Sequence, residues 1–231
     1  MALCLAISLI VQGKFSAYDQ LVRYRWWYRY GYMSSTGVCF DIGKATRHAI
    51  EQFEQRQRRV AKEENIPIPK MDCLADQRII EKVDVYCSPG RSAGNGGLMR
   101  LGPVPLFFHK YPQKAVELSG MSGQITHEDD RSYDACRYYG ALIVAALQGE
   151  TKDELLDPRF YQKHKEWFQN KPLSEEIQTV VTGSYRRSGG YEEGIRGKGY
   201  VVTSLEAALW AFWSDEDSAE KGFLLVVNLG N

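Results

Sequence analysis

The feature that most limits the fold of this chain is the spacing of its apolar residues. No stretch shows a convincing two-residue alternation of apolar and polar side chains, which is the pattern of a half-buried strand. Apolar residues instead recur at helical spacing, and glycine-rich loops separate one such segment from the next. The 231 residues are enough for one domain with a sizeable core. The pattern therefore predicts an all-α fold, an orthogonal helical bundle that forms a single domain over residues 1–231.

Local signals mark where the helices are expected to begin and end. Ser16 is expected to cap the second helix, and Asp41 and Ser204 are candidates for the same role before later helices. Gly120 is expected to end the helix that precedes it. The helices are expected over Ala2–Val11, Ala17–Tyr30, Lys44–Asn65, Pro112–Ser119, Arg131–Leu147, Glu175–Val181, Leu205–Trp213 and Ser218–Asn228.

Three of these segments carry further expectations. The first, Ala2–Val11, and the last, Ser218–Asn228, are strongly apolar and are expected to be buried. Residues 23–30, R-Y-R-W-W-Y-R-Y, alternate arginine with aromatic residues, a pattern that stacks on single-stranded nucleic acid in some proteins. The other interpretation is a core helix whose arginines extend past Trp26 and Trp27 to solvent, and the zero net charge favours it.

The composition excludes several classes of partner. Formal net charge is zero and the sequence pI is about 6.9, so nothing indicates binding to nucleic acid or to a membrane surface. The apolar first eleven residues are too short to span a bilayer and lack the basic start of a signal peptide. A monomer is expected. A reducing, cytoplasmic location is expected because the cysteines are odd in number and widely spaced: Cys4, Cys39, Cys73, Cys87 and Cys136.

The stretch from Ser88 to Pro105 is the strongest candidate for a binding site. Four glycines fall within eight residues, and the apolar residues 98–101 behind them are expected to open a helix. Consecutive amides in such a loop are able to point into one concavity, and glycine lets a ligand approach the backbone closely. With Arg91 and Arg100 nearby, the arrangement suits a phosphate or diphosphate. An ordinary glycine-rich turn is the alternative, since the loop fits neither the P-loop nor the G-x-G-x-x-G spacing.

Two other segments leave alternatives open. His127 precedes Asp129 and Asp130, and the three side chains are able to ligate a divalent metal. The same acids also stabilise the N-terminus of the helix that follows, which requires no function. Residues 186–200 contain five glycines and form either a surface linker or a lid over a ligand.

Four motifs along the chain resemble one known family. They are S-A-G-N-G-G-L-M-R at residues 92–100, G-Y-M-S-S-T-G-V-C-F-D-I-G at 31–43, I-T-H-E-D-D at 125–130 and E-A-A-L-W-A-F at 206–212. Their identity and order resemble the ADP-ribosylglycohydrolase family, which includes the dinitrogenase reductase-activating glycohydrolases. The resemblance extends over nearly the whole chain.

The resemblance implies an all-α architecture with a cleft that holds ADP-ribose beside two magnesium or manganese ions. The implied reaction is hydrolysis of the glycosidic bond that joins ADP-ribose to a side chain of a modified protein, arginine in many members. The metals would orient the ribose and activate water. The resemblance assigns no catalytic residue here. The positions that it implies as contacts to ADP-ribose are Ser92, Gly94, Asn95, Gly96 and His127, with Asp41 and Tyr191 as weaker candidates.

The metal ligands that the resemblance implies do not match any position of this sequence. Relatives carry one acidic motif just before the segment that corresponds to Ala2–Val11, and a second just after the Asn-Leu-Gly segment at 228–230. The chain is therefore expected to be truncated at both ends, with no metal ligand within it. Two functions follow from this: part of a metal-dependent ADP-ribosyl-protein hydrolase, or a catalytically inactive relative that only binds an ADP-ribose-like nucleotide or has a structural role.

Overall fold

The computed structural model describes residues 1–88 and 90–229, and every regular element among them is a helix. An isolated antiparallel bridge joins Gly94 to Tyr200. The all-α prediction is therefore confirmed. The elements are α1 Ala2–Gln12, α2 Ala17–Tyr30, α3 Lys44–Glu63, α4 Ile68–Met71, α5 Gln77–Ile80, α6 Gly96–Arg100, α7 Pro103–Phe108, α8 Pro112–Gln124, α9 Asp130–Leu147, α10 Lys152–Leu155, α11 Phe160–Lys163, a 3-10 turn Lys165–Phe168, α12 Glu175–Thr179, a π turn Val180–Ser184, α13 Val201–Ser214 and α14 Ala219–Val227.

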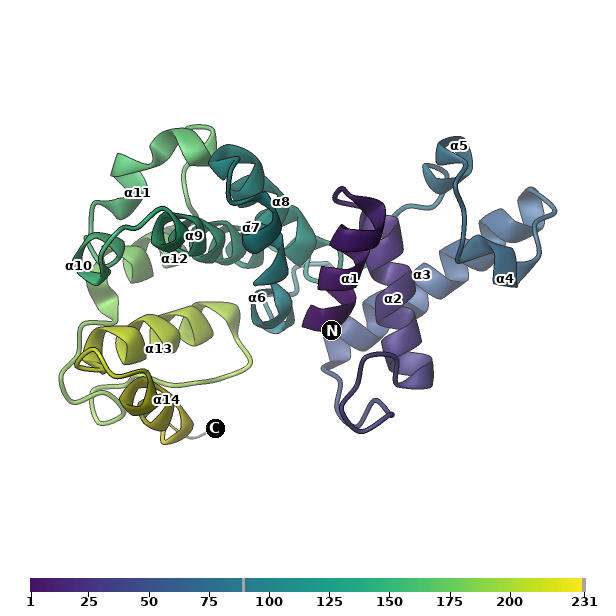
Figure 1. Cartoon of the computed structure of the whole chain (residues 1–231). Helices are drawn as coiled ribbons and strands as arrows, with labels where there is room; N and C mark the ends of the chain where they lie inside the picture. The colour runs from purple at the N-terminus through teal and green to yellow at the C-terminus, as the bar shows by residue number, and fades with distance from the viewer. Residues whose placement is uncertain (89, 230–231) are drawn as a thin grey trace.

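The helices form two groups, which meet where α1 packs against α7 and α6. Helices α1 to α5 lie on one side and α7 to α14 on the other, with α6 near the junction (Figure 1). The buried apolar residues form two clusters, a first that joins α1 to α4 with residues of α7 to α9, and a second that runs from α8 to α13. Ala115 and Val116, consecutive residues of α8, belong to the first and the second cluster respectively. Helix α8 thus serves both halves of the core.

Glycines allow α8 and α9 to approach closely. A β-carbon at Gly140 of α9 would lie 2.5 Å from Ser119 Oγ of α8, and one at Gly120 would collide with the ring of Tyr133. The prediction that Gly120 ends its helix is wrong, because α8 continues to Gln124 and uses this glycine for packing.

A polar cap fixes the start of α2. Ser16 Oγ accepts from Asp19 N there, as predicted.

Two other predicted caps are wrong. Helix α3 begins after Gly43, and no side chain bonds to its first turn, so Asp41 does not cap it. Helix α13 begins at Val201, earlier than predicted, so Ser204 lies inside the helix. The reason is that the preceding segment pairs with Gly94, which sets the start of α13 through a contact distant in sequence.

Two of the three arginines of α2 are buried. Arg23 and Arg25 are each only 8% exposed, whereas Trp26 and Trp27 are half-buried. Arg25 donates to Gln57 Oε1 of α3 (2.5 Å) and to Asp72 after α4. Helix α2 is therefore a core helix, and polar bonds help to hold it there. Arg23 and Arg25 do not extend past the tryptophans to solvent, whereas the side chain of Arg29 is 41% exposed, as predicted.

The two apolar terminal helices are less buried than predicted. Helix α1 buries one face, while Ile10 is 70% exposed. No residue of α14 is buried, and Phe223 is 74% exposed. An apolar hollow of about 520 Å³ lies between α13 and α14, lined in part by Phe212 and Val226. In the part of the chain that the structure describes, no helix is long and apolar enough to cross a membrane.

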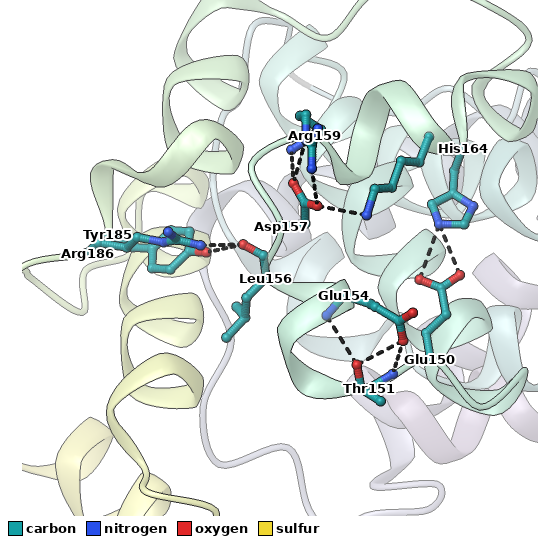
Figure 2. A network of polar contacts seen from close by, with 10 residues as sticks. Glu150, Thr151, Glu154, Leu156, Asp157, Arg159, His164, Tyr185 and Arg186 are labelled. Atoms are coloured by element: carbon teal, nitrogen blue, oxygen red, sulfur yellow. Dashed lines mark hydrogen bonds and ion pairs between the residues drawn. The ribbon is translucent and has the colours of Figure 1, made fainter.

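The connection from α9 to α12 is organised by polar contacts (Figure 2). Thr151 and Glu154 form a capping box at the start of α10, and His164 Nε2 lies 3.0 Å from a carboxylate oxygen of Glu150. The carbonyl of Leu156 accepts from Arg186 Nη2 at 2.6 Å. This bond therefore fixes the start of residues 186–200 to the connection between α9 and α12.

Candidate functional site

A hollow of about 620 Å³ lies where four parts of the chain meet. They are the start of α1, the residues that lead into and open α3, the glycine-rich loop with α6, and the turn that holds His127, to which Trp27 of α2 and Gly199 before α13 add one residue each. Four glycines are among its lining residues, and glycine lets a ligand approach the main chain closely. The lining residues are Met1, Ala2, Trp27, Phe40, Asp41, Ile42, Gly43, Lys44, Ala45, Thr46, Gly94, Asn95, Gly96, Met99, Arg100, His127 and Gly199.

His127 packs directly against the glycine-rich loop. A β-carbon on Gly94 would lie 3.1 Å from the imidazole Nε2, and one on Gly96 would lie 2.9 Å from its Cε1. Neither glycine has a positive φ, so close approach of the ring, and not backbone conformation, is what requires glycine at these positions. The motif thus brings together two stretches about thirty residues apart, and His127 is only 2% exposed.

A buried arginine supports the histidine from behind. Arg100 Nη2 donates to Thr126 Oγ1 (2.7 Å) and to Ser122 O (2.7 Å), and Nη1 donates to Gly96 O (2.9 Å). Thr126 Oγ1 lies 2.8 Å from His127 Nδ1. Burial, with a further effect of the nearby Arg100 charge, lowers the pKa of His127 to about 3. The imidazole is therefore neutral at neutral pH.

The glycine-rich loop is tied to the segment before α13. Asn95 N donates to Gly199 O (2.9 Å), and Val201 N donates to Ala93 O (2.9 Å). The Asn95 side-chain Nδ2 donates to Ser204 Oγ at 2.9 Å. The backbone amide and side-chain amide of Asn95 thus hold the wall together, so neither is free to meet a ligand.

The predicted ligand contacts divide into two groups. The structure brings Asp41, Gly94, Asn95, Gly96 and His127 to the same hollow. It does not bring Ser92 or Tyr191 there. The Ser92 carbonyl lies 3.4 Å from Ser132 Oγ, and Tyr191 is 47% exposed with its ring 3.6 Å from the Arg196 guanidinium carbon.

The glycine-rich segment at 186–200 is anchored along its length. Ile195 is fully buried, Trp210 Nε1 donates to Arg187 O (2.8 Å), and Gly190 lies against the Trp210 ring. Only its last residues reach the hollow, through Gly199. Neither a loose surface linker nor a lid describes this segment, because its middle packs on α13.

The acids beside His127 serve α9. Asp129 Oδ1 accepts from Arg131 N (3.0 Å) and caps the helix, and the same carboxylate pairs with the Arg131 side chain at 2.8 Å. Hydrogen bonds from Arg131 lower the pKa of Asp129. Within residues 1–88 and 90–229, no three His, Cys, Asp or Glu side chains are grouped so as to hold a metal ion. Helix capping, and not metal binding with His127, is therefore the role that the structure supports for Asp129.

Sequence reasoning missed two residues of the site. Thr126, fully buried, links Arg100 to His127, and the only available signal was its position next to the histidine. Thr46 in the first turn of α3 would lie 3.1 Å from a β-carbon at Gly96. Nothing local in the sequence marks Thr46, because its contact depends on how α3 packs on the loop.

The fold and this cleft define a class of protein. The chain belongs to the ADP-ribosylglycohydrolase family, whose sequence model matches residues 1–231. It is 30% identical over 234 residues to ADP-ribosylarginine hydrolase Tri1 of Serratia proteamaculans (strain 568), a match that covers 100% of this chain and 53% of the relative. It is 32% identical over 234 residues to the protein of the same name from Pseudomonas putida (strain GB-1), covering 100% of this chain and 52% of that one.

A solved structure agrees with the sequence relationship. An ADP-ribosylglycohydrolase-related protein complex superposes with a TM-score of 0.69 at 31% identity, over 100% of this chain and 62% of the matched chain. The chain thus has the fold of the family. It spans about half the length of the two relatives named Tri1.

Proposed function

We propose that this chain forms the ADP-ribose-binding part of a hydrolase that removes ADP-ribose from modified proteins, with arginine as the modified side chain. The observation that carries the proposal is the hollow in which Gly94, Gly96 and His127 lie together. The relatives named ADP-ribosylarginine hydrolase support the choice of substrate. The protein partner is then an ADP-ribosylated protein.

The hollow has features suited to a diphosphate-containing ligand. Lys44 and Arg100 are two cationic side chains in its wall, against a single carboxylate, Asp41. Residues 41–43 and 94–96 line it as well. We expect the histidine and the glycine backbone to contact the ligand, and aromatic side chains such as Trp27 to pack against it.

The magnesium or manganese pair implied by the family does not fit the residues of this chain. Hard divalent ions prefer several oxygen ligands, and Asp41 is the one carboxylate in the wall of the hollow among the described residues. A chain with this donor set binds the nucleotide and leaves the metal-dependent chemistry to other residues. The same observation favours the alternative, a relative that only binds ADP-ribose.

A chimaera separates the two functions. The parts of the Serratia relative outside the 234 matched residues are joined to this chain, and release of ADP-ribose from a protein modified on arginine is measured with Mg²⁺ and with EDTA. The intact relative is the positive control. Mg²⁺-dependent release by the chimaera is expected. A folded chimaera that binds ADP-ribose without releasing it would support the binding-only alternative, and neither binding nor release would refute the proposal.

A glycine variant tests the location of the site. Gly96→Ala would place a β-carbon 2.9 Å from the His127 ring, and we expect it to weaken ADP-ribose binding by the chimaera at least tenfold in calorimetry. Gly102→Ala is the matched control, because no atom lies within 4 Å of its added β-carbon. Equal affinities for the two variants would place the ligand elsewhere.

A further inference from the structure

The hydroxyl of Thr126 lies between an arginine and a histidine. Its oxygen is 2.7 Å from Arg100 Nη2, 2.8 Å from His127 Nδ1 and 3.5 Å from Gly123 O. A guanidinium only donates, so the Thr126 oxygen accepts from Arg100. The single hydroxyl proton then has two possible acceptors, the imidazole Nδ1 and the Gly123 carbonyl oxygen.

The distances decide between them. A separation of 2.8 Å is normal for a hydrogen bond from a hydroxyl, whereas 3.5 Å is at the limit of one. Thr126 therefore donates to Nδ1, which must be the unprotonated nitrogen of the ring. In a neutral imidazole the proton then sits on Nε2.

The Nε2 atom faces the hollow. β-Carbons on Gly94 and Gly96 would lie 3.1 Å and 3.3 Å from it, and both glycines line the hollow. Nε2 forms no hydrogen bond to any group among residues 1–88 and 90–229. The ring therefore has one engaged nitrogen at its back and one unengaged donor at the front.

Burial, with the Arg100 charge as a smaller effect, keeps the ring neutral. Arg100 reaches it from α6, and the other charged groups in the wall of the hollow are Lys44, Asp41 and the α-amino group of Met1. Arg100, which forms no ion pair among the described residues, opposes protonation of the ring. The positive side chain thus acts on His127 both through its field and through the Thr126 hydroxyl.

We propose that Arg100 and Thr126 fix His127 as the Nε2–H tautomer, so that the imidazole presents one defined hydrogen-bond donor to the hollow. Arg100 and Thr126 are positioning residues, since they act through His127. The identity of the acceptor, an oxygen of ADP-ribose, rests on the proposed function. The tautomer does not, because it follows from contacts within the chain.

Nitrogen NMR of the histidine rings tests this directly. The chain has four histidines, so two-bond ¹H–¹⁵N spectra of ring-labelled protein are simple, and His48→Gln, His109→Gln and His164→Gln identify the His127 signals by elimination. At pH 7 we expect Nε2 to show the shift of a protonated nitrogen and Nδ1 that of an unprotonated one. An Nδ1–H ring, or averaged shifts from two tautomers, would overturn the proposal without any variant of the site.

Two variants at one position test the relay. Thr126→Val removes the hydroxyl and is expected to abolish the single tautomer, giving averaged ring shifts, whereas Thr126→Ser keeps the hydroxyl and is expected to retain it. An unchanged His127 spectrum in folded Thr126→Val would overturn the relay. An Nε2–H ring in a chimaera that neither binds nor releases ADP-ribose would refute the proposed function alone, so the two failures are distinguishable.

Discussion

Two buried arginines of the molecule are held in opposite ways. Arg25 of α2 is 8% exposed and meets the carboxylate of Asp72 and the amide oxygen of Gln57. Arg100 of α6 is 2% exposed, donates only to neutral oxygens, namely two carbonyls and the Thr126 hydroxyl, and lies over the ring of Tyr24. Among the described residues, no carboxylate lies within ion-pair distance of Arg100.

The difference separates a structural contact from a candidate functional one. A buried charge without a counter-charge is costly, whereas a paired and hydrogen-bonded one is tolerated. The Arg25 pair joins α2, α3 and the turn after α4, and its charge is neutralised there. Arg100 instead leaves a positive charge beneath the hollow, where it suppresses protonation of His127 and would favour an anionic ligand.

The largest expected effect comes from breaking the paired arginine. Asp72→Ala leaves the Arg25 guanidinium without its carboxylate and Trp26 Nε1 without its acceptor. We expect a loss of about 3–5 kcal/mol in the free energy of unfolding, measured by urea denaturation. The control Glu63→Ala removes an exposed partner of Arg59 and should cost less than about 0.5 kcal/mol. Similar losses for both variants would mean that the buried pair contributes no more to the free energy of unfolding than an exposed pair does.

The next largest effect is a pH dependence of the free energy of unfolding, which originates at His127 beside Arg100. The pKa of His127 falls from 6.5 to about 3 on folding, so between these values the unfolded state binds more protons and stability falls as the pH falls. Between pH 6.5 and pH 5 the loss is about 1.7 kcal/mol. Urea denaturation across this range should show it in the wild type and not in His127→Gln. The exposed His48→Gln should retain the full dependence, and a flat wild-type profile would contradict the shift.

A smaller effect is expected when each arginine is replaced by methionine. Arg100→Met leaves no buried carboxylate behind and should cost about 1–2 kcal/mol, mainly from the carbonyls of Gly96 and Ser122 that lose their donor. Arg25→Met leaves Asp72 unpaired and should cost more. In the NMR titration, Arg100→Met should raise the pKa of His127. A pKa that stays unchanged would show that burial alone suppresses protonation.

The smallest effect is expected at an exposed apolar residue, which is the opposite case to a buried arginine. Phe223 of α14 is 74% exposed, so Phe223→Ser should change the free energy of unfolding by less than about 0.5 kcal/mol. Leu205→Ala in α13, at 1% exposure, should cost about 2–5 kcal/mol in the same urea experiment. A large loss for Phe223→Ser would mean that α14 is covered in solution.

Local signals predicted where helices lie far better than which residues they bury. Helix α2 has its predicted bounds because Ser16 caps its start and Gly31 takes a left-handed conformation at its end. Arg23 and Arg25 were expected to reach solvent, as Arg29 does, and α14 was expected to be buried, since residue class was the only guide available. Both expectations failed because burial depends on partners such as Asp72, which no local pattern reveals.

The candidate site shows the same division. The proximity of Gly94, Gly96 and His127 was predictable, because the motifs that carry them occur together in the family. Thr126 was not recognised, since its role depends on Arg100 reaching across from another helix. The engagement of Asn95 with Ser204 was likewise unpredictable, because it joins residues more than a hundred positions apart.

That long-range contact has a consequence for how the molecule is made. The wall of the hollow includes Gly199, and the glycine-rich loop is completed only by bonds to residues 199–204. During synthesis on the ribosome, α1 to α9 emerge well before their last partner does. The nascent chain must therefore keep an unfinished cleft until α13 leaves the exit tunnel, and contacts of such sequence separation form late and slowly.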